Sequence, residues 1–282
     1  LAAVVERNKN ESREKYPQAK IYRSVEEMLA DDTLQLIIVN TPTHTHYAYV
    51  KAALQKGKHI IVEKPFTVLV KEAEELNALA EKNNLLLSVY HNRRYDGDYL
   101  AVKKVIGENS LGELREVEIR YDRYRTSASG KQHKEGDLPG AGTLYDLGSH
   151  LIDQALQLFG RPDALFADLA TMRENVKAVD YFELLLFYKK MRVRLKATVI
   201  ARETYYAYIV HGMKGSFLHH RSDRQEQQLL DGIAPSVKPW CALSQEPNGI
   251  LHAEINGEEI RKQVTSPPGN YMDYFTDVYK AL

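Results

Sequence analysis

The sequence has 282 residues, of which 44% are hydrophobic and 27% charged, a composition typical of a globular protein with a substantial core. Its 38 basic residues balance its 38 acidic residues, which argues against nucleic acid or an anionic membrane as the main partner, and no apolar run approaches the roughly 18 residues of a membrane helix. The single cysteine, Cys241, excludes an intramolecular disulfide and a cysteine-rich zinc site, and favours a reducing cytoplasm.

Apolar strands and helical segments alternate along the first third of the chain. Strands are expected at residues 2–5, 34–40, 59–64 and 85–90, and helices at 25–30, 44–57 and 71–83. The first of these helices starts with a capping-box pattern, because Ser24 precedes it and Glu27 follows three residues later. Continuous apolar strands that alternate with helices indicate βαβ units and a parallel sheet covered on both faces. Residues 1–93 are therefore expected to form an α/β domain.

The pattern changes after Arg94. A helix is expected at 97–108, and residues 113–125 alternate between apolar and charged side chains, which is typical of a half-exposed antiparallel strand. Further strands are expected at 163–172, 180–188, 191–202, 205–212 and 215–220, and a late hairpin at 249–255 and 258–264 that turns at Asn256–Gly257. Residues 225–238 are expected to form a mobile loop. Runs of antiparallel strands predict an α+β domain with one large open sheet for residues 94–282.

Polar or special residues follow each of the predicted parallel strands. In such sheets, ligands bind outside the carboxyl ends of the strands. The residues at those ends are Glu6–Arg7, Asn40–Thr41–Pro42, Glu63–Lys64–Pro65 and His91–Asn92–Arg93. Loops are polar in any case, but the repetition of this pattern at every strand end favours a ligand site at this edge of the sheet.

Lys64 stands at the end of the most apolar of these strands. A lysine that is partly desolvated at the mouth of a parallel sheet can donate a hydrogen bond to a substrate oxygen. Pro65 fixes the backbone after it, and an X–Pro bond can be cis or trans, which would aim the lysine differently. The alternative is an ordinary surface lysine after a strand, which is the usual location of this residue type.

The segment "GAGTLYDLGSHLID" combines a glycine-broken loop with a carboxylate and an imidazole. Gly140 and Gly142 allow a tight loop, and Asp146 and His150 share a face if the following residues are helical. A carboxylate beside an imidazole can hold it as a proton acceptor. Two alternatives stay open: Asp146 is an acid favoured at a helix N-terminus, or Asp146, His150 and Asp153 are metal ligands.

The segment "NTPTHTH" joins a predicted strand to a predicted helix. Backbone amides at the start of a helix are ready-made anion donors, and they could face a cofactor phosphate or ribose. Helix capping by Thr43 or Thr45 is the simpler explanation, and the two are compatible.

These motifs together resemble the Gfo/Idh/MocA family of NAD(P)-dependent oxidoreductases. That family shares "AGKHVxxEKP", "TPxxxH" and "GGGxxxDxGxHxxD", which stand here as "QKGKHIIVEKP", "NTPTHTH" and "GAGTLYDLGSHLID". The segments "LLSVYHNRRYD", "GTLYDLGSHLIDQ" and "RENVKAVDYF" are most similar to the branch of scyllo-inositol dehydrogenases that use NADP. The resemblance covers essentially the whole chain. It implies a Rossmann-type, doubly wound parallel sheet in residues 1–93 and a large open, mainly antiparallel sheet in residues 94–282.

The resemblance also implies roles for individual residues. Lys64 matches the catalytic lysine that contacts the substrate oxygen and the nicotinamide ribose, while Asp146 and His150 match its two partners, with His150 as the proton acceptor. Cofactor contacts are expected at Glu6, Arg7, Asn40, Thr41, Pro42, His46, Glu63, Lys64 and Asn92. No metal is expected, because the hydride chemistry belongs to the nicotinamide cofactor.

The glycine-rich G-x-G-x-x-G loop of the family is absent from this sequence. That loop belongs to the first βα unit, and the chain opens at what should be the second strand, so about 30 residues of βαβ structure are expected to precede it. The sequence also stops before the final helices that the family usually carries. We therefore expect the chain to be a piece of a longer protein, truncated at both ends.

Glu6 and Arg7 give opposite indications about the cofactor. An acid at the end of the second strand normally binds the adenosine ribose hydroxyls and favours NAD. The arginine beside it can pair with a 2′-phosphate and favours NADP. The expected cofactor is therefore NAD or NADP, with the preference left open.

The sequence thus predicts an oxidoreductase that transfers a hydride between a secondary alcohol of an inositol-like cyclic polyol or sugar and a nicotinamide cofactor. The alternatives are a regulatory protein of the same fold that senses NAD(P) or a sugar without turnover, and a metal-dependent lyase or hydrolase. Tyr124, Arg125 and the loop near His133 are expected to line the pocket. A homodimer or homotetramer through the open sheet is expected, because a large sheet face is seldom left bare.

Overall fold

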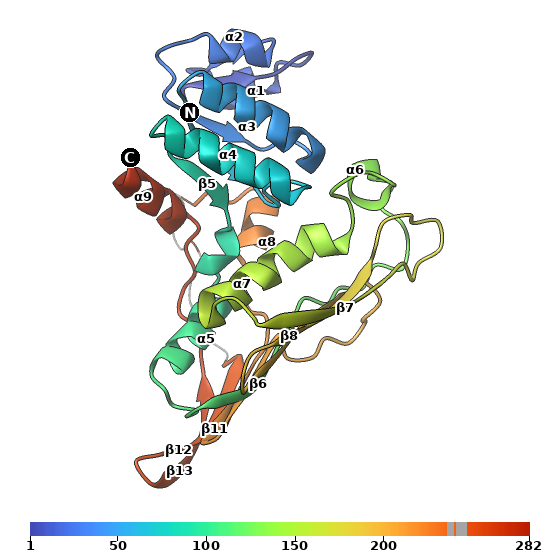
Figure 1. Cartoon of the computed structure of the whole chain (residues 1–282), viewed down its shortest axis with the longest axis vertical. Coiled ribbons are helices and arrows are strands. Elements are labelled where there is room, and N and C mark those ends of the chain that lie inside the picture. Colours follow the sequence, from blue (N-terminus) through green and yellow to red (C-terminus); the bar gives the residue numbers. More distant parts are fainter. Residues whose placement is uncertain (236–239, 241–246) are drawn as a thin grey trace. The chain divides into compact units, whose positions relative to one another are not determined.

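The computed structural model describes residues 1–235, 240 and 247–282, without the side chains of residues 132 and 133 (Figure 1). Cys241 and the end of the loop expected at 225–238 lie outside the described residues. The chain forms two compact units, one of Leu1–Tyr90 with Ala281–Leu282 and the other of His91–Lys280. The domain limits taken from the sequence, 1–93 and 94–282, stay a prediction. None of the described helices is both long enough and apolar enough to cross a membrane.

The first unit alternates short strands with helices, as its apolar pattern predicts. Its strands are β1 (Ala3–Val5), β2 (Lys20–Tyr22), β3 (Leu36–Val39), β4 (His59–Glu63) and β5 (Leu87–Tyr90). Its helices are α1 (Glu11–Lys15), α2 (Val25–Leu29), α3 (His46–Gln55) and α4 (Val70–Lys82), with a short 3-10 turn, η1 (Thr43–Thr45), before α3. Every strand pair in this unit is parallel. The short β2 is the one strand here that the apolar pattern did not predict.

The core of the first unit lies around β4. Ile60, Ile61 and Val62 are almost completely buried, which explains why this strand has no polar face. Helices α3 and α4 pack against each other and cover the sheet with Val50, Leu54 and Leu76. Ser24 caps α2 as predicted, since its hydroxyl oxygen accepts the Glu27 N–H at 3.1 Å.

The parallel sheet of this unit is divided into two pieces. β1 pairs only with β2, while β3, β4 and β5 form a separate three-stranded sheet. A cavity of about 780 Å³ is lined by residues of both β1 and β3, so these two strands do not hydrogen-bond to each other. The carboxyl ends of β3, β4 and β5 lie at one edge of their sheet, because all three strands run in the same direction.

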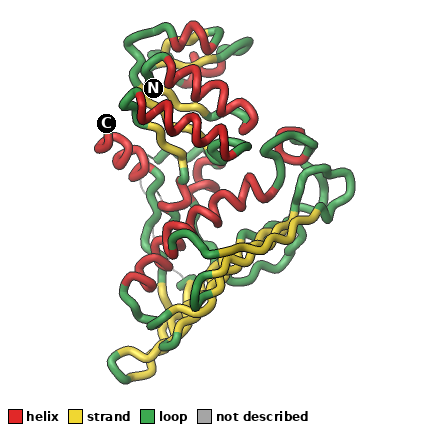
Figure 2. The backbone as a smooth tube through the Cα atoms, in the orientation of Figure 1, coloured by secondary structure: helices red, strands yellow, loops and turns green. Residues whose placement is uncertain are grey.

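The second unit is built on one eight-stranded sheet with the order β13-β12-β11-β10-β6-β9-β8-β7 (Figure 2). Its strands are β6 (Leu114–Arg120), β7 (Ala164–Ala170), β8 (Tyr181–Phe187), β9 (Arg192–Thr198), β10 (Tyr208–Gly212), β11 (Gly215–His219), β12 (Gly249–Ile255) and β13 (Glu258–Val264). Its helices are η2 (Asn92–Tyr95), α5 (Gly97–Gly107), α6 (Gln132–Glu135), the π-helical turn η3 (Leu144–Gly148), α7 (Ser149–Phe159), α8 (Gln225–Leu230) and α9 (Met272–Ala281). The predicted large open sheet is therefore confirmed.

The two faces of this sheet differ in chemistry. Val117, Ile119 and Leu195 point into the core, where α5 and α7 cover the sheet. The side chains between them lie on the opposite face and form a ladder of ion pairs, of which Glu118–Arg194 and Arg194–Glu183 are examples. This alternation is the period-two pattern that the sequence of 113–125 displays.

Two local predictions hold only in part. β6 was expected to be antiparallel, and it pairs antiparallel with β10 but in parallel with β9. Alternation of apolar and polar residues is the same in both kinds of pairing, so it could not distinguish them. The loop expected from Gln225 instead begins with the helix α8. The hairpin turn at Asn256–Gly257 is confirmed, with positive φ angles at both residues.

Candidate active site

The ends of β3 and β4 carry the polar residues that the sequence singled out. Asn40, Thr41 and Pro42 follow β3 directly, while Lys64 follows β4, of which Glu63 is the last residue. The Lys64–Pro65 peptide bond is cis. The Lys64 N–H donates to the Glu63 carboxylate at 3.3 Å, and burial raises the pKa of Glu63 even though the Lys64 ammonium opposes that rise.

His46, the first residue of α3, contacts the backbone after both of these strands. Its side chain is buried, with Nε2 2.7 Å from the carbonyl oxygen of Thr41 and Nδ1 2.9 Å from that of Pro65. The imidazole therefore fixes the backbone after β3 against the backbone after β4. Its predicted contact with the cofactor stays a prediction, because both ring nitrogens already face the chain itself.

The cavity of about 780 Å³ in the first unit is bordered by the predicted cofactor residues Arg7, Asn40, Thr41 and Pro42. The Arg7 guanidinium donates to the Tyr49 hydroxyl at 2.8 Å, and Tyr49 also lines the cavity. Glu6 lies beside it, with its carboxylate 3.3 Å from the backbone N–H of Ser12, near the start of α1. Most of the other lining residues are apolar side chains of β1, α2 and β3, so the polar groups that a ligand could meet lie at the carboxyl ends of the strands.

The polar groups at the ends of β1 and β3 fit parts of a dinucleotide. An arginine and a carboxylate at the end of β1 suit the adenosine ribose or its 2′-phosphate, and Asn40 and Thr41 offer polar groups at the end of β3. The glycine-rich turn that normally cradles the pyrophosphate is not among residues 1–56, since Gly57 is the first glycine in the sequence. The residues present therefore fit the adenosine ribose end of such a cofactor.

In the second unit, Asp146 lies in the π-helical turn η3 and His150 in the first turn of α7. A π-helical turn of this kind is frequent at functional sites. The loop before it needs Gly142, because φ there is +99° and an added Cβ would lie 2.7 Å from the carbonyl oxygen of Val179. The Asp146 N–H donates to the Gly142 carbonyl oxygen at 2.9 Å, so the position of the carboxylate depends on this glycine.

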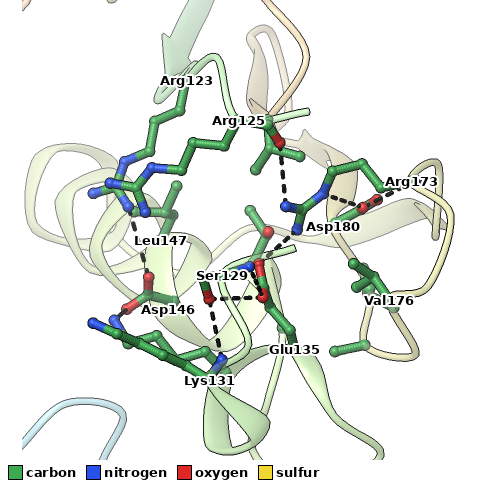
Figure 3. A pocket seen from close by; sticks show the side chains of 16 residues that line it. Arg123, Arg125, Ser129, Lys131, Glu135, Asp146, Leu147, Arg173, Val176 and Asp180 are labelled. Atoms are coloured by element: carbon green, nitrogen blue, oxygen red, sulfur yellow. Dashed lines mark hydrogen bonds and ion pairs between the residues drawn. The ribbon is translucent and has the colours of Figure 1, made fainter. Parts of the chain in front are cut away.

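Asp146 is surrounded by cations. Its two oxygens lie 3.6 Å from Lys134 Nζ and 3.9 Å from an Arg123 nitrogen (Figure 3). Sequence reasoning missed both partners, because neither is close to Asp146 in the chain. They belong to a cavity of the second unit that Asp146 also lines, together with the predicted pocket residue Arg125. Tyr124 is not among its lining residues and instead accepts a hydrogen bond from Arg202.

His150 is buried on α7, and its ring meets that of His91 edge-on, with the ring centroids 6.5 Å apart. One helical turn further, Asp153 accepts two hydrogen bonds from Arg94, at 2.6 and 2.8 Å. Because Arg94 occupies both carboxylate oxygens, Asp153 is poorly suited to bind a metal. Among the residues that the structure describes, no three His, Cys, Asp or Glu side chains are grouped to hold a metal ion.

The predicted site residues are thus divided between the two units. Lys64 and the cofactor positions Glu6, Arg7, Asn40, Thr41, Pro42, His46 and Glu63 belong to the first unit. Asp146, His150 and Asn92 belong to the second, where Asn92 opens η2 directly after β5 and His91. In the first unit, Arg7, Asn40, Thr41 and Pro42 border one cavity. In the second, the ring of His150 meets that of His91, the residue before Asn92. The catalytic set of Lys64, Asp146 and His150 stays a prediction.

Both units match known protein families. Residues 1–91 match the oxidoreductase family with an NAD-binding Rossmann fold, and residues 99–218 match the GFO/IDH/MocA C-terminal domain. The chain belongs to the Gfo/Idh/MocA family. The Rossmann-type fold, the dehydrogenase class and the nicotinamide cofactor predicted from the sequence are therefore confirmed.

Individual members of the Gfo/Idh/MocA family match nearly the whole chain. The scyllo-inositol 2-dehydrogenase (NADP(+)) IolW of Bacillus subtilis is 36% identical over 100% of this chain and 78% of its own length. Among solved structures, the oxidoreductase YvaA from Bacillus subtilis has a TM-score of 0.94 at 36% identity and covers 100% of this chain and 80% of that one. An oxidoreductase from Bacteroides fragilis has a TM-score of 0.88 at 44% identity, with coverage of 99% and 80%.

Proposed function

We propose that this protein is a dehydrogenase that transfers a hydride between a secondary alcohol of an inositol-like cyclic polyol or sugar and a nicotinamide cofactor. The observation that carries the proposal is the buried imidazole of His150, one helical turn after the Asp146 carboxylate. A buried imidazole beside a carboxylate suits a proton acceptor for a substrate hydroxyl. The similarity to a scyllo-inositol 2-dehydrogenase along the whole chain supports the substrate class.

In the proposed reaction, a nicotinamide cofactor would supply the acceptor for the hydride of the alcohol carbon. His150 accepts the hydroxyl proton at the same time, so the alcohol becomes a ketone. Lys64 donates a hydrogen bond to the reacting oxygen and stabilises the negative charge that develops there, which is often the largest catalytic contribution. Asp146 orients His150 and Lys64. The reverse direction uses the same groups with His150 as the proton donor.

The choice between NAD and NADP belongs to the same proposal. Glu6 favours NAD because it can bind the ribose hydroxyls, whereas Arg7 favours NADP because it can bind a 2′-phosphate. The similar protein IolW is named for its use of NADP.

We also propose that the protein is cytoplasmic, in keeping with its single cysteine. Assembly into a homodimer or homotetramer through the uncovered face of the eight-stranded sheet completes the proposal.

The substitution Lys64→Ala tests the mechanism. We expect the variant to lose most of its turnover, because one preorganised donor to a developing oxyanion is typically worth a factor of roughly 100 to 1,000 in kcat. Cofactor binding, measured by nicotinamide fluorescence, should remain. Near-normal turnover in Lys64→Ala would contradict the proposed role of this lysine.

A non-catalytic regulator of the same fold is the second candidate. It is weakened by the presence of lysine, aspartate and histidine at all three predicted positions, since a protein that only binds has no chemical need for them. A panel of inositols and aldoses with NAD and with NADP, followed by nicotinamide absorbance, distinguishes the two. Binding of a sugar or cofactor without any absorbance change across the panel would favour the regulator.

A further inference from the structure

The second unit contains a cavity of about 100 Å³ whose lining is strongly charged (Figure 3). It lies between the segment after β6, the loop before η3, and the loop that joins β7 to β8. Its charged lining residues are five cations and three carboxylates: Arg123, Arg125, Lys131, Lys134, Arg173, Glu135, Asp146 and Asp180. The lining therefore carries an excess of positive charge.

One side of this cavity is a closed structural network. Arg173 is almost completely buried, and its guanidinium contacts Asp180 at 2.9 Å and Glu135 at 3.1 Å. The same guanidinium donates to the backbone carbonyl oxygen of Arg125 at 3.2 Å. Glu135 also accepts hydrogen bonds from Ser129. These two carboxylates are therefore committed to holding the loops together and do not neutralise the cations on the other side.

The other side has four cations and one carboxylate. Arg123 and Lys134 share Asp146, at 3.9 and 3.6 Å. The Arg125 guanidinium and the Lys131 ammonium have no ion pair or hydrogen bond with any described residue, and both side chains reach the cavity. Glu226, which lies within electrostatic reach of Arg123, is paired with Arg93. Arg125 and Lys131 are thus available to an anion beside Asp146.

The charges around the cavity indicate which groups that anion can carry. A volume of about 100 Å³ leaves room for a carboxylate or a phosphate group between them. Arginine is the side chain best suited to bind either group, because its planar fork matches two oxygens at once.

We infer that this cavity binds an acidic substituent, a carboxylate or a phosphate, carried by the polyol or sugar substrate. The inference rests on the proposed function and narrows its substrate class from neutral polyols to acidic ones. Arg125 would contact the acidic group directly, with Lys131 as a second cation. The ring would then extend from the cavity along Asp146, which lines it and belongs to the proposed catalytic set.

A matched substrate series tests the inference. Glucose, glucuronate and glucose 6-phosphate differ in their substituent at one carbon, which is neutral, a carboxylate or a phosphate. We expect calorimetric titration of the full chain to detect binding of at least one of the two anionic sugars and of inorganic phosphate, with glucose much weaker. In Arg125→Ala, anion binding should weaken roughly tenfold or more, since a charge-assisted hydrogen bond is lost. Arg125→Lys should restore part of it.

Arg261→Ala is the control, because Arg261 is an exposed arginine of the same unit on the distant strand β13. Its anion binding should equal that of the wild type. Preferential binding of glucuronate over glucose 6-phosphate would identify a carboxylate, and the opposite order a phosphate. Equal anion binding in the wild type and Arg125→Ala, or none in either, would overturn the inference. Turnover with neutral polyols alone would overturn the inference and leave the dehydrogenase proposal standing. Binding of an anionic sugar that weakens in Arg125→Ala, without turnover of any polyol, would support the anion site and contradict the dehydrogenase proposal.

Discussion

Asp96, just before α5, is a completely buried carboxyl group. Tyr271 donates to it at 2.9 Å, and an Arg93 nitrogen lies 3.2 Å away. Burial raises the pKa of Asp96 to about 8, and the positive charges of Arg93 and Arg221 offset only part of this effect. We therefore expect the folded protein to keep a proton on Asp96 at neutral pH, where an exposed aspartate has lost it.

A pH dependence of stability follows from this single residue. Because the folded state keeps a proton that the unfolded state loses above about pH 4, Asp96 makes the free energy of unfolding fall as pH rises from about 4 to 8. The slope contributed is up to about 1.4 kcal/mol per pH unit. Urea unfolding of the wild type and of Asp96→Asn between pH 5 and 8 measures it. We expect the wild-type curve to fall more steeply; parallel curves would mean that the neighbouring arginines keep Asp96 ionised.

At the scale of elements, the loop and π-helical turn before α7 determine where the Asp146 carboxylate lies. We expect Gly142→Ala to lower the free energy of unfolding by about 2–3 kcal/mol, because alanine is strained at a positive φ and its Cβ would meet the Val179 carbonyl oxygen. Turnover should fall as well, since the backbone of Gly142 binds that of Asp146. Thermal unfolding and steady-state kinetics check both expectations.

Gly130→Ala is the matched control for this loop. Gly130 also has a positive φ, +73°, but nothing lies within 4 Å of its added Cβ. Its substitution should therefore cost only the backbone strain, about 1 kcal/mol, and leave turnover unchanged. Equal losses in the two variants would show that the approach to Val179 has no role in positioning Asp146.

The elements that local chemistry determines could be predicted from the sequence. The apolar run of β4 and the turn residues Asn256 and Gly257 are examples, because buried strands and tight turns restrict residue types directly. The polar helix α8 was missed, since it has no apolar periodicity to detect.

The candidate site shows the same boundary between local and long-range information. Asp146 and His150 could be predicted as neighbours because they are one helical turn apart. Asp153 could be considered as a metal ligand from the sequence because its actual partner, Arg94, lies 59 residues away and cannot be recognised from the motif. The Arg123 and Lys134 contacts with Asp146 are equally non-local. Residue types in a motif predict which groups are present, whereas their partners depend on how distant segments pack.

At the scale of the whole molecule, the eight-stranded sheet ends in an edge strand that exposes large apolar side chains on both of its faces. On β7, Leu165 and Phe166 are 62% and 59% exposed. Leu165 pairs with the buried Leu186 and so lies on the helix-covered face, whereas Phe166 pairs with Leu185 on the uncovered face. If copies of the chain assemble through the uncovered face, these two neighbours should respond differently to the same substitution.

We expect Phe166→Asp to dissociate the assembly, because a carboxylate without a partner is costly to bury in an apolar interface. Leu165→Asp places the same charge one residue away on the other face, so it should leave the assembly intact. Sedimentation velocity of the wild type and both variants over a range of concentrations measures the outcome. A wild type that is monomeric throughout, or dissociation by Leu165→Asp alone, would refute assembly through this face. Selective dissociation by Phe166→Asp would mean that the ion-pair ladder beside it is partly enclosed between copies, where its charges are stabilised more strongly than in water.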